Sequence, residues 1–406
     1  MTKQAIHAPR TAAHATAATA ILVLAGGLVT AAEPKLGGIA EAMEKMIAAG
    51  EIAGGVTVVL APDHLLHLES HGLADVASGR PMTPTTLFWI ASMTKPVTGT
   101  AIAMLIDEGK VAIDDPVEKF IPEFAELKGP SGGPARITIR QILTHTSGLG
   151  EASPETTKAA HNLAALVPAW LAAPMKNEPG EKWIYTQSGI NLAGRIVEVV
   201  TGRPFDAFLQ ERLFDPLGMV DTTFYPTDEQ RTRLATPYAR NRDTGALEQS
   251  PPRQEYGVRP RPPQGNGGLY STPRDYAAFC RMLLNRGMVD GRSYLREAGL
   301  RAVSTVQTGD LPTGFFQSDA FGNHGKDYGW GLGTCVLRQP HAGVAAMLSP
   351  GTFGHGGAWG TQAWIDPTRR VSYALFVQRT NFPNSDASDV RRVFQEAAAA
   401  ALPKAP

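Results

Sequence analysis

The spacing of apolar residues predicts a helix, two strands and a buried helix in the first part of the chain. Residues 35–49 carry apolar side chains at roughly helical intervals, which indicates a helix. Residues 53–61 and 64–70 are apolar segments separated by a proline and an aspartate, a pattern typical of a β-hairpin. Residues 91–109 are apolar nearly all round, so we expect a buried helix that ends at a glycine.

Helical patterns dominate the middle of the chain, and strand patterns return toward its end. Helices are predicted at 188–202 and 204–218, whereas residues 235–268 are rich in arginine, proline and glycine and predict a long surface loop. A helix over 272–287 has Thr272 as its candidate N-cap. The last segments are predicted as three strand regions and a closing helix, at 328–337, 360–367, 370–378 and 389–402.

Strand patterns near both ends, with helical patterns between them, predict an α+β fold. In this fold an antiparallel sheet flanked by helices is built from both termini and carries an inserted, mainly helical lobe. We expect the sheet lobe to comprise about residues 33–90 and 272–406, and the helical lobe about residues 91–271. A chain of 406 residues is long enough for one large core or two lobes.

The first 32 residues differ from everything that follows. They contain Lys3 and Arg10 but no acid, and a largely apolar run then ends in small residues, with Thr30 and Ala32 at the −3 and −1 positions of a candidate cleavage site. The run is short for a membrane span. We therefore predict a signal peptide at residues 1–32, a periplasmic or secreted protein, and no stable membrane insertion after cleavage. A retained membrane anchor is the alternative.

Charge and cysteine content argue against several classes of protein. The formal net charge is zero, so the chain has no electrostatic footprint for nucleic acid, and no such partner is expected. Cys280 and Cys335 form neither a CxxC pair nor a metal-ligand spacing, which argues against a disulfide scaffold and against a zinc site. The two cysteines allow one disulfide at most.

The segment FWIASMTKPVTG, residues 88–99, places Ser92 and Lys95 three positions apart at the start of the predicted buried helix. Positions i and i+3 of a helix share a face, so Lys95 can reach the hydroxyl of Ser92. A serine hydroxyl needs a base to become a good nucleophile, and a lysine serves as one only when its pKa is lowered. The apolar residues on both sides favour the burial that lowers it. For this motif alone, a serine that merely caps the helix is the alternative.

Two later stretches add candidate residues. Tyr185 lies in a turn just before a helix, where it is either a surface aromatic residue or, near a cationic lysine, a phenolate that shuttles protons. His355 is followed by Gly356 and Gly357 at the edge of a strand, and glycines there permit a ligand to approach the backbone closely. A glycine-rich bulge beside a solvated histidine is the alternative.

Other nucleophile and ligand-binding patterns are weaker. His145 and Ser147 stand two residues apart in a loop, where their side chains need not face each other. The GxSxG match at 129–133 lacks the preceding strand and following helix of a nucleophile elbow. The glycine-rich residues 329–333 lie among strand patterns, unlike a nucleotide-binding loop. Ser188 is expected to be the N-cap of the helix that follows it.

The three candidate stretches occur together in the order and approximate spacing of the motifs of penicillin-recognising serine hydrolases. The chain most resembles the branch that contains class C β-lactamases, DD-peptidases and family VIII carboxylesterases. The motif residues are Ser92-Met93-Thr94-Lys95, Tyr185-Thr186-Gln187 and His355-Gly356-Gly357. Supporting stretches extend the resemblance over nearly the whole mature chain: TIRQILTHTSGLG (138–150), RLFDPLGMVDTTF (212–224), GGLYSTPRDYAAF (267–279) and YGWGLG (328–333).

The resemblance implies a β-lactamase/transpeptidase-like fold and a serine hydrolase that forms an acyl-enzyme on Ser92. Lys95 and Tyr185 would share the role of base, and Tyr185 would then help water to attack the ester intermediate. The backbone amides of Ser92 and Ala358 would form the oxyanion hole. Such an enzyme needs neither a metal nor an organic cofactor. The residues expected to contact the substrate are Gln187, His355, Gly356, Gly357 and Trp359.

Two positions depart from the β-lactamase pattern and bear on the substrate. Gln187 stands where β-lactamases have asparagine, and its side chain is one methylene longer. His355 stands where they usually have lysine, and a histidine is mostly neutral near pH 7, so it offers no fixed charge to a penicillin carboxylate. We therefore expect the hydrolysis of small acyl esters. A peptidase or amidase acting on D-amino acids, a β-lactamase, and a non-catalytic cell-wall binding or sensor protein are the alternatives.

Overall fold

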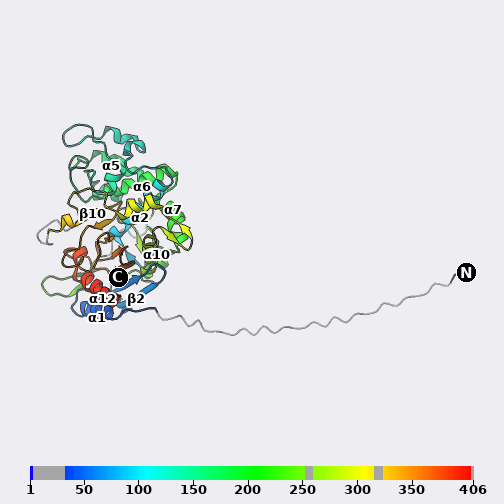
Figure 1. Ribbon diagram of the computed structural model, residues 1–406, viewed down its shortest axis with the longest axis vertical. Coiled ribbons are helices and arrows are strands. Elements are labelled where there is room, and N and C mark those ends of the chain that lie inside the picture. Colours follow the sequence, from blue (N-terminus) through cyan, green and yellow to red (C-terminus); the bar gives the residue numbers. More distant parts are fainter. Residues whose placement is uncertain (3–32, 252–258, 315–322, 404–406) are drawn as a thin grey trace. The chain divides into compact units, whose positions relative to one another are not determined.

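The computed structural model describes residues 1–2, 33–251, 259–314 and 323–403, and residues 33–406 form one compact unit (Figure 1). The predicted signal peptide lies outside the described residues, apart from its first two positions. Within the described ranges, no helix is both long and apolar enough to cross a membrane. The helices and strands that the structure describes all belong to the compact unit.

An eight-stranded antiparallel sheet organises the molecule, in the order β10-β11-β12-β13-β14-β1-β2-β3. β1 comes from the N-terminal part of the chain and pairs with β14 from its C-terminal part, with Val58 opposite Ala374. The predicted sheet built from both ends of the chain is therefore confirmed. Its strands are β1 (Gly54–Leu60), β2 (Leu65–Asp75), β3 (Arg80–Pro81), β10 (Tyr328–Trp330), β11 (Cys335–Leu337), β12 (Phe353–Gly356), β13 (Gln362–Asp366) and β14 (Val371–Phe376).

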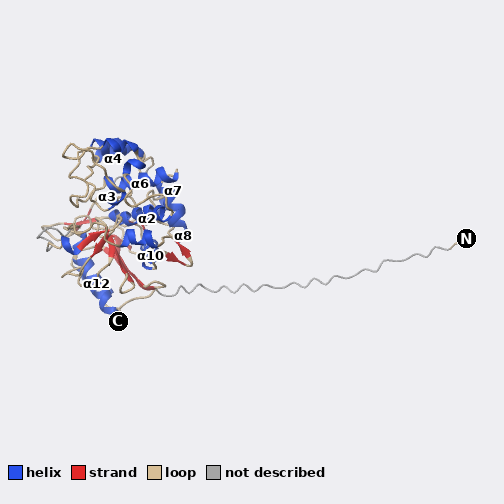
Figure 2. Ribbon diagram, turned by 45° about the horizontal axis from the view of Figure 1, so that its top comes forward, coloured by secondary structure: helices blue, strands red, loops and turns tan. Residues whose placement is uncertain are grey.

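Helices cover both faces of this sheet. Val58 of β1 belongs to a core that includes Phe279 of α10 (Pro273–Leu284). Its neighbour Val59 faces the other way, into a core with Met43 of α1 (Ile39–Ala48) and Phe394 of α12 (Asp389–Ala401). Because both faces of β1 are buried, its residues other than Thr57 are apolar, without alternation. Figure 2 shows the strands of the sheet between α12 and α10.

Most of the other helices gather beyond one side of the sheet, and α2 lies between them and the strands (Figures 1 and 2). α2 is buried along nearly all of its length, as its apolar sequence predicts. The predicted helix at 204–218 consists of α7, a π-helical segment at Gln210–Phe214 and α8. The helices not yet introduced are α2 (Thr94–Asp107), α3 (Ile139–Leu143), α4 (Pro154–Ala159), α5 (Val167–Ala172), α6 (Ser188–Thr201), α7 (Phe205–Leu209), α8 (Asp215–Leu217), α9 (Asp228–Thr232) and α11 (Glu297–Ser304).

Local predictions in the second half of the chain have mixed outcomes. Thr272 caps α10, because its hydroxyl accepts a hydrogen bond from the amide of Asp275. The surface loop predicted at 235–268 is wrong in part, since its first half forms a hairpin and Gln264 near its end is buried. Cys280 and Cys335 are buried free thiols. The short strand pairs are β5 (Tyr238–Arg240) with β6 (Leu247–Gln249), β4 (Phe88–Trp89) with β7 (Tyr270–Ser271), and β8 (Met288–Val289) with β9 (Arg292–Ser293).

Candidate active site

Ser92 lies in a 3₁₀ turn, Ala91–Met93, immediately before α2. Ala91 has a φ of +47°, a left-handed conformation that costs free energy for a residue with a Cβ, so the backbone is strained directly before the serine. Two hydroxyl groups hold the turn: Thr94 donates to the carbonyl of Ala91 at 2.7 Å, and Tyr276 of α10 donates to that of Met93 at 2.8 Å. These two hydrogen bonds hold the strained turn and so fix the position of Ser92.

Lys95 follows Ser92 by one turn and is fully buried. Its Nζ lies 3.0 Å from Ser92 Oγ, 3.1 Å from Gln187 Oε1 and 2.7 Å from the backbone oxygen of Asn266. Burial lowers the pKa of Lys95 well below its ordinary value, and nearby carboxylates oppose this shift only in part. The neutral amine form of Lys95 is therefore favoured far more than that of a lysine in water.

The hydrogen bonds of that neutral amine determine where its lone pair points. A neutral lysine amine has two N–H groups and one lone pair. The carbonyl oxygens of Gln187 and Asn266 only accept hydrogen bonds, so they take the two N–H groups. The lone pair is left facing the hydroxyl of Ser92, which is the arrangement that a general base requires.

The hydroxyl of Tyr185 reaches Ser92 from the other side. Its oxygen lies 2.9 Å from Ser92 Oγ and 3.5 Å from His355 Nε2. Burial raises the pKa of Tyr185 well above its ordinary value, so the phenol keeps its proton and donates it to Ser92. The phenolate that the sequence left open near a cationic lysine is therefore disfavoured, because desolvation opposes both that phenolate and the cationic form of Lys95.

His355 on β12 presents a lone pair to the same phenol. Its Nδ1 lies 2.6 Å from the carbonyl oxygen of Gly356, which only accepts hydrogen bonds, so Nδ1 carries the ring proton and Nε2 faces Tyr185 unprotonated. Burial lowers the pKa of His355 to about 3. The ring is therefore neutral at ordinary pH, as expected from the sequence, and carries no fixed charge for a substrate carboxylate.

Gly356 and Gly357 are required by close protein neighbours. A Cβ at Gly356 would lie 1.8 Å from Asp386 Oδ1, and one at Gly357 would lie 2.6 Å from the carbonyl oxygen of Ile90, close to Ser92. Both distances are far below van der Waals contact, so any side chain here would push β12 away from its neighbours. The sequence suggested the approach of a ligand as the reason for these glycines; the structure adds the approach of the protein itself, and both glycines also line the cavity in front of Ser92.

The backbone amides of Ser92 and Ala358 have the environment of an oxyanion hole. In the part of the chain that the structure describes, neither amide donates a hydrogen bond to a protein acceptor, and both residues line one cavity. Unpaired N–H groups beside a nucleophile can stabilise a developing negative charge. Trp359 is not among the described residues that line this cavity. Its ring packs edge-on against Trp89, with 4.5 Å between ring centres.

The cavity in front of Ser92 has a volume of about 410 Å³. Its walls consist of residues from all three sequence motifs, including Gln187 and His355, and of residues 382–386. No lysine or arginine is among the described residues that line it, whereas Asp386, a buried residue whose Oδ1 accepts a hydrogen bond from Gln362, is. The cavity therefore offers no cationic side chain to a carboxylate-bearing substrate.

Sequence reasoning missed residues that reach the site from distant segments. Asn266 lies 171 positions from Lys95, in the segment predicted as a surface loop. The run of glycines around it was the available signal, because a Cβ at Gly265 would lie 2.8 Å from Thr98 Oγ1 of α2. Glu151 directly follows the supporting stretch at 138–150 but was not itself singled out, and Asp386 has no motif around it.

The weaker nucleophile pair does not form. Ser147 Oγ accepts a hydrogen bond from the amide of Leu149, whereas the His145 ring packs 4.4 Å from the centre of the Tyr185 ring. His145 Nδ1 also accepts a hydrogen bond from the amide of Thr186 at 3.2 Å. His145 therefore supports the tyrosine. Ser188, which the sequence predicts as an N-cap, is instead the first residue of α6, and Gln187 occupies the N-cap position.

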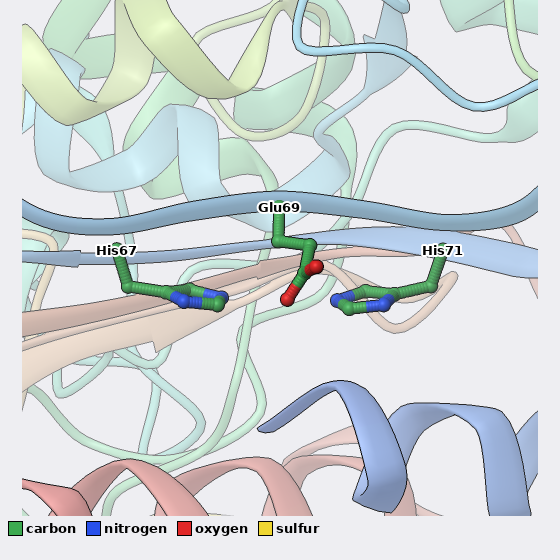
Figure 3. A group of neighbouring side chains, drawn as sticks. All are labelled: His67, Glu69 and His71. Carbon is green, nitrogen blue, oxygen red and sulfur yellow. The ribbon is translucent and has the colours of Figure 1, made fainter. Parts of the chain in front are cut away.

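His67, Glu69 and His71 on β2 have side chains suited to a metal, with one ligand atom of each within 4.8 Å of the others (Figure 3). However, the amide of Leu36 donates to His67 Nδ1 at 3.0 Å, so the proton of the neutral ring lies on Nε2, which donates to Thr57 Oγ1 at 2.8 Å. A protonated ring nitrogen cannot bind a metal ion. We therefore interpret this cluster as a structural network that ties the segment before α1 to the sheet.

Comparisons with known proteins agree with this geometry. The family model described as Beta-lactamase matches residues 39–398. An uncharacterized protein of Mycobacterium tuberculosis is 34% identical over 353 residues, which are 81% of this chain and 86% of that protein. Esterase EstB of Burkholderia gladioli is 28% identical, over 80% of this chain and 85% of the esterase. The structure of simvastatin synthase (LovD) from Aspergillus terreus is similar with a TM-score of 0.73 and 25% identity, over 89% of this chain and 97% of that one.

Proposed function

The chain belongs to the Beta-lactamase family of serine hydrolases, and from this premise we propose that it is an esterase that cleaves small acyl esters through an acyl-enzyme on Ser92. The observation that carries the proposal is the hydrogen-bonded group of Ser92, Lys95 and Tyr185, in which Lys95 and Tyr185 lie 3.0 and 2.9 Å from Ser92 Oγ. A non-catalytic cell-wall binding or sensor protein has no need of such a group, so we disfavour that alternative.

In the acylation step, the neutral amine of Lys95 takes the proton of Ser92 while Oγ attacks the carbonyl carbon of the ester. The amides of Ser92 and Ala358 stabilise the oxyanion that develops. As the C–O bond breaks, Tyr185 gives its proton to the leaving alkoxide, and the proton held by Lys95 replaces it. The alcohol leaves, and the acyl group stays on Ser92.

In the deacylation step, water occupies the place of the alcohol and the proton transfers run in the opposite direction. Tyr185 takes a proton from the attacking water as it passes its own back toward Lys95, and Ser92 Oγ regains its proton when the acid departs. His355 Nε2 lies 3.5 Å from the Tyr185 oxygen and can accept the single hydroxyl proton only when that proton is not directed at Ser92 Oγ or at the leaving group.

The charges around the cavity favour esters over β-lactams and D-alanyl peptides, which carry a carboxylate. His355 is neutral, and no lysine or arginine is among the described lining residues. A substrate carboxylate would therefore enter without a cationic partner. A D-amino-acid peptidase or amidase and a β-lactamase are the alternatives, both acting through the same acyl-enzyme.

Labelling with a fluorophosphonate probe tests the acyl-enzyme. We expect the wild-type protein to be labelled, Ser92→Ala to be unlabelled, and Ser293→Ala, which changes an exposed serine of β9, to be labelled like the wild type. The proposal fails if the wild type and Ser92→Ala are equally unlabelled.

Parallel assays with p-nitrophenyl butyrate, nitrocefin and a D-alanyl peptide test the substrate class. We expect the highest kcat/KM for the ester. A higher kcat/KM for the peptide would replace the esterase by a peptidase, and a higher value for nitrocefin would replace it by a β-lactamase.

We also propose that the protein is exported, on the basis of the basic and then apolar sequence of residues 1–32. Expression of the full-length chain in a bacterium with two membranes tests this. We expect a periplasmic product whose N-terminus, determined by mass spectrometry, is close to Glu33. A full-length product in the cytoplasmic fraction would contradict export.

A further inference from the structure

The carboxylate of Glu151 holds the first turn of α6 from a loop 36 residues earlier in the chain. Its Oε1 accepts a hydrogen bond from the amide of Gln187 at 2.6 Å. Its Oε2 accepts hydrogen bonds from the amide of Ser188 at 2.9 Å and from the Ser188 hydroxyl at 2.7 Å. Both oxygens of one side chain are therefore used on two consecutive residues of the second sequence motif and its helix.

The first turn of α6 needs this external partner because its own N-cap residue is occupied elsewhere. Gln187 makes no side-chain capping hydrogen bond, since its Oε1 accepts hydrogen bonds from Lys95 Nζ at 3.1 Å and from Asn266 Nδ2 at 2.8 Å. The first amides of a helix have no acceptor within the helix, and the helix dipole favours a negative charge beside them. Glu151 supplies both the acceptors and the charge.

The same turn carries the two side chains that contact the nucleophile and its base. Tyr185 donates to Ser92 Oγ, and Gln187 accepts one of the N–H groups of Lys95. A shift of the backbone at residues 185–188 would move both contacts together. Misplacement of catalytic groups by about 1 Å is enough to cost on the order of 100-fold in rate.

Glu151 also acts on Lys95 through its charge. Together with Asp386 it is one of the two carboxylates that raise the pKa of Lys95 against the larger effect of desolvation. Lys176, whose Nζ lies 3.9 Å from Glu151 Oε1, is the cation beside it. Loss of the Glu151 charge should therefore lower the pKa of Lys95 further.

We propose that Glu151 is a positioning residue of the esterase: its carboxylate fixes the first turn of α6 and thereby holds Tyr185 and Gln187 against Ser92 and Lys95. The inference rests on the proposed function, because it assigns these four residues to the reaction. Glu151 itself contacts neither Ser92 nor the substrate carbonyl in this role, and acts through the backbone of α6.

The test compares Glu151→Gln with the wild type in steady-state hydrolysis of p-nitrophenyl butyrate. The glutamine keeps the size of the side chain but turns an N–H group toward an amide donor and removes the charge. We expect kcat to fall about 10- to 100-fold with KM changed less than about threefold, because the variant loses alignment at the reacting atoms and not substrate contacts. The matched control is Glu155→Gln, an exposed acid of α4, which should keep the wild-type kcat.

The pH profile separates this role from a purely structural one. Lys95 acts as a base only when it is neutral, so the acid limb of kcat/KM reports its titration. Removal of the negative charge of Glu151 disfavours the ammonium form, and the acid limb should move to lower pH in Glu151→Gln. A wild-type kcat and an unshifted acid limb would overturn the proposal, as would a fall in kcat that only matches the fraction of unfolded protein seen by circular dichroism.

A second variant covers the case in which the glutamine prevents folding. Glu151→Ala leaves space beside the helix N-terminus, and added formate can place a carboxylate there. We expect formate, but not chloride at equal ionic strength, to restore part of the lost kcat. Failure of formate to restore any activity in a folded Glu151→Ala protein would contradict the proposal.

The failure of the proposed function is distinguishable from the failure of this inference. A wild-type protein that hydrolyses no ester and takes no fluorophosphonate label rejects the esterase. In that case NMR titration of ¹³Cε-labelled lysine, with Lys95 assigned from Lys95→Ala, still decides the role of Glu151. A lower pKa of Lys95 in Glu151→Gln than in the wild type supports the contact, and an equal pKa rejects it.

Discussion

At the scale of single residues, the candidate site depends on keeping an amine and a phenol uncharged next to one hydroxyl. Burial lowers the pKa of Lys95 and raises that of Tyr185, so one physical cause favours the neutral form of both groups. A neutral amine is a base and a neutral phenol is an acid. These are the two functions needed to carry a proton from Ser92 to a leaving group.

Removal of the amine tests the first of these functions. We expect Lys95→Ala to lower kcat/KM for p-nitrophenyl butyrate at least about 100-fold, since a positioned general base contributes roughly 10²- to 10⁴-fold. Circular dichroism should show an intact fold, because the change removes a buried amine and leaves α2 with a better helix former. Lys110→Ala, a largely exposed lysine just after α2, is the control and should behave like the wild type. A near-normal rate in Lys95→Ala would remove this lysine from the proposed mechanism.

Removal of the phenol hydroxyl tests the second function, the donation of a proton to the leaving group. Esters whose leaving groups differ in their need for a proton show whether Tyr185 supplies it. Tyr185→Phe keeps the ring that packs against His145 but lacks the hydroxyl 2.9 Å from Ser92 Oγ. We expect kcat/KM for ethyl butyrate to fall about 100-fold or more, because an alkoxide must be protonated as it leaves. The loss for p-nitrophenyl butyrate should be smaller, since nitrophenolate leaves without a proton. Equal losses for the two esters would argue against Tyr185 as the proton donor.

At the scale of structural elements, a buried histidine fastens the segment before α1 to β2. The amide of Leu36 donates to His67 Nδ1, and the amide of Leu68 donates to the carbonyl of Pro34 at 2.9 Å. A protonated His67 would present an N–H group to the Leu36 amide and lose that hydrogen bond. The attachment of this segment therefore requires a neutral ring.

The stability of the protein should consequently depend on pH through His67. Burial lowers its pKa to about 4 in the folded protein, with Glu69 opposing the shift and His71 and Lys35 adding to it, while the unfolded value is 6.5. A depressed folded pKa means that the stabilisation is complete above pH 6.5 and is lost as the pH falls toward 4. We expect the Tm measured by calorimetry to fall over this interval, and less steeply in His67→Gln. His161→Gln, an exposed histidine, should follow the wild-type curve, and identical curves for all three proteins would contradict this role.

Elements with a local signal could be predicted from the sequence, and contacts made across the fold could not. The cap of α10 at Thr272 and the buried α2 follow from residues next to each other in the chain. The cap of α6 does not, since the sequence places a serine there while the acceptor comes from Glu151 in another loop. Asn266 was missed for the same reason, because its contact with Lys95 depends on tertiary structure and its own segment has no periodicity.

At the scale of the whole molecule, the last helix of the chain supports a wall of the cavity in front of Ser92. Arg391 of α12 donates to the backbone oxygen of Asp386 at 2.6 Å, and its guanidinium lies 4.1 Å from the ring centre of Trp364 on β13. Gln362, also on β13, donates to Asp386 Oδ1 at 3.0 Å. The sheet and α12 therefore hold residues 382–386 together, although these residues lie almost 300 positions after the nucleophile.

This arrangement predicts that a substitution in α12 changes substrate binding. Arg391 is buried, and methionine fills similar space without the hydrogen bond, so Arg391→Met should fold while residues 382–386 lose an anchor. Since a hydrogen bond from a charged group contributes roughly 1.5–3 kcal/mol, we expect KM for p-nitrophenyl butyrate to rise about tenfold with little change in kcat. Arg392→Met is the matched control, because its side chain is partly exposed and, among the residues that the structure describes, its ion pairs are with Asp389 and Glu396 on its own helix. An equal KM in the two variants would show that α12 does not shape the cavity. A rise in KM confined to Arg391→Met would instead place a determinant of substrate binding in α12, far along the chain from Ser92.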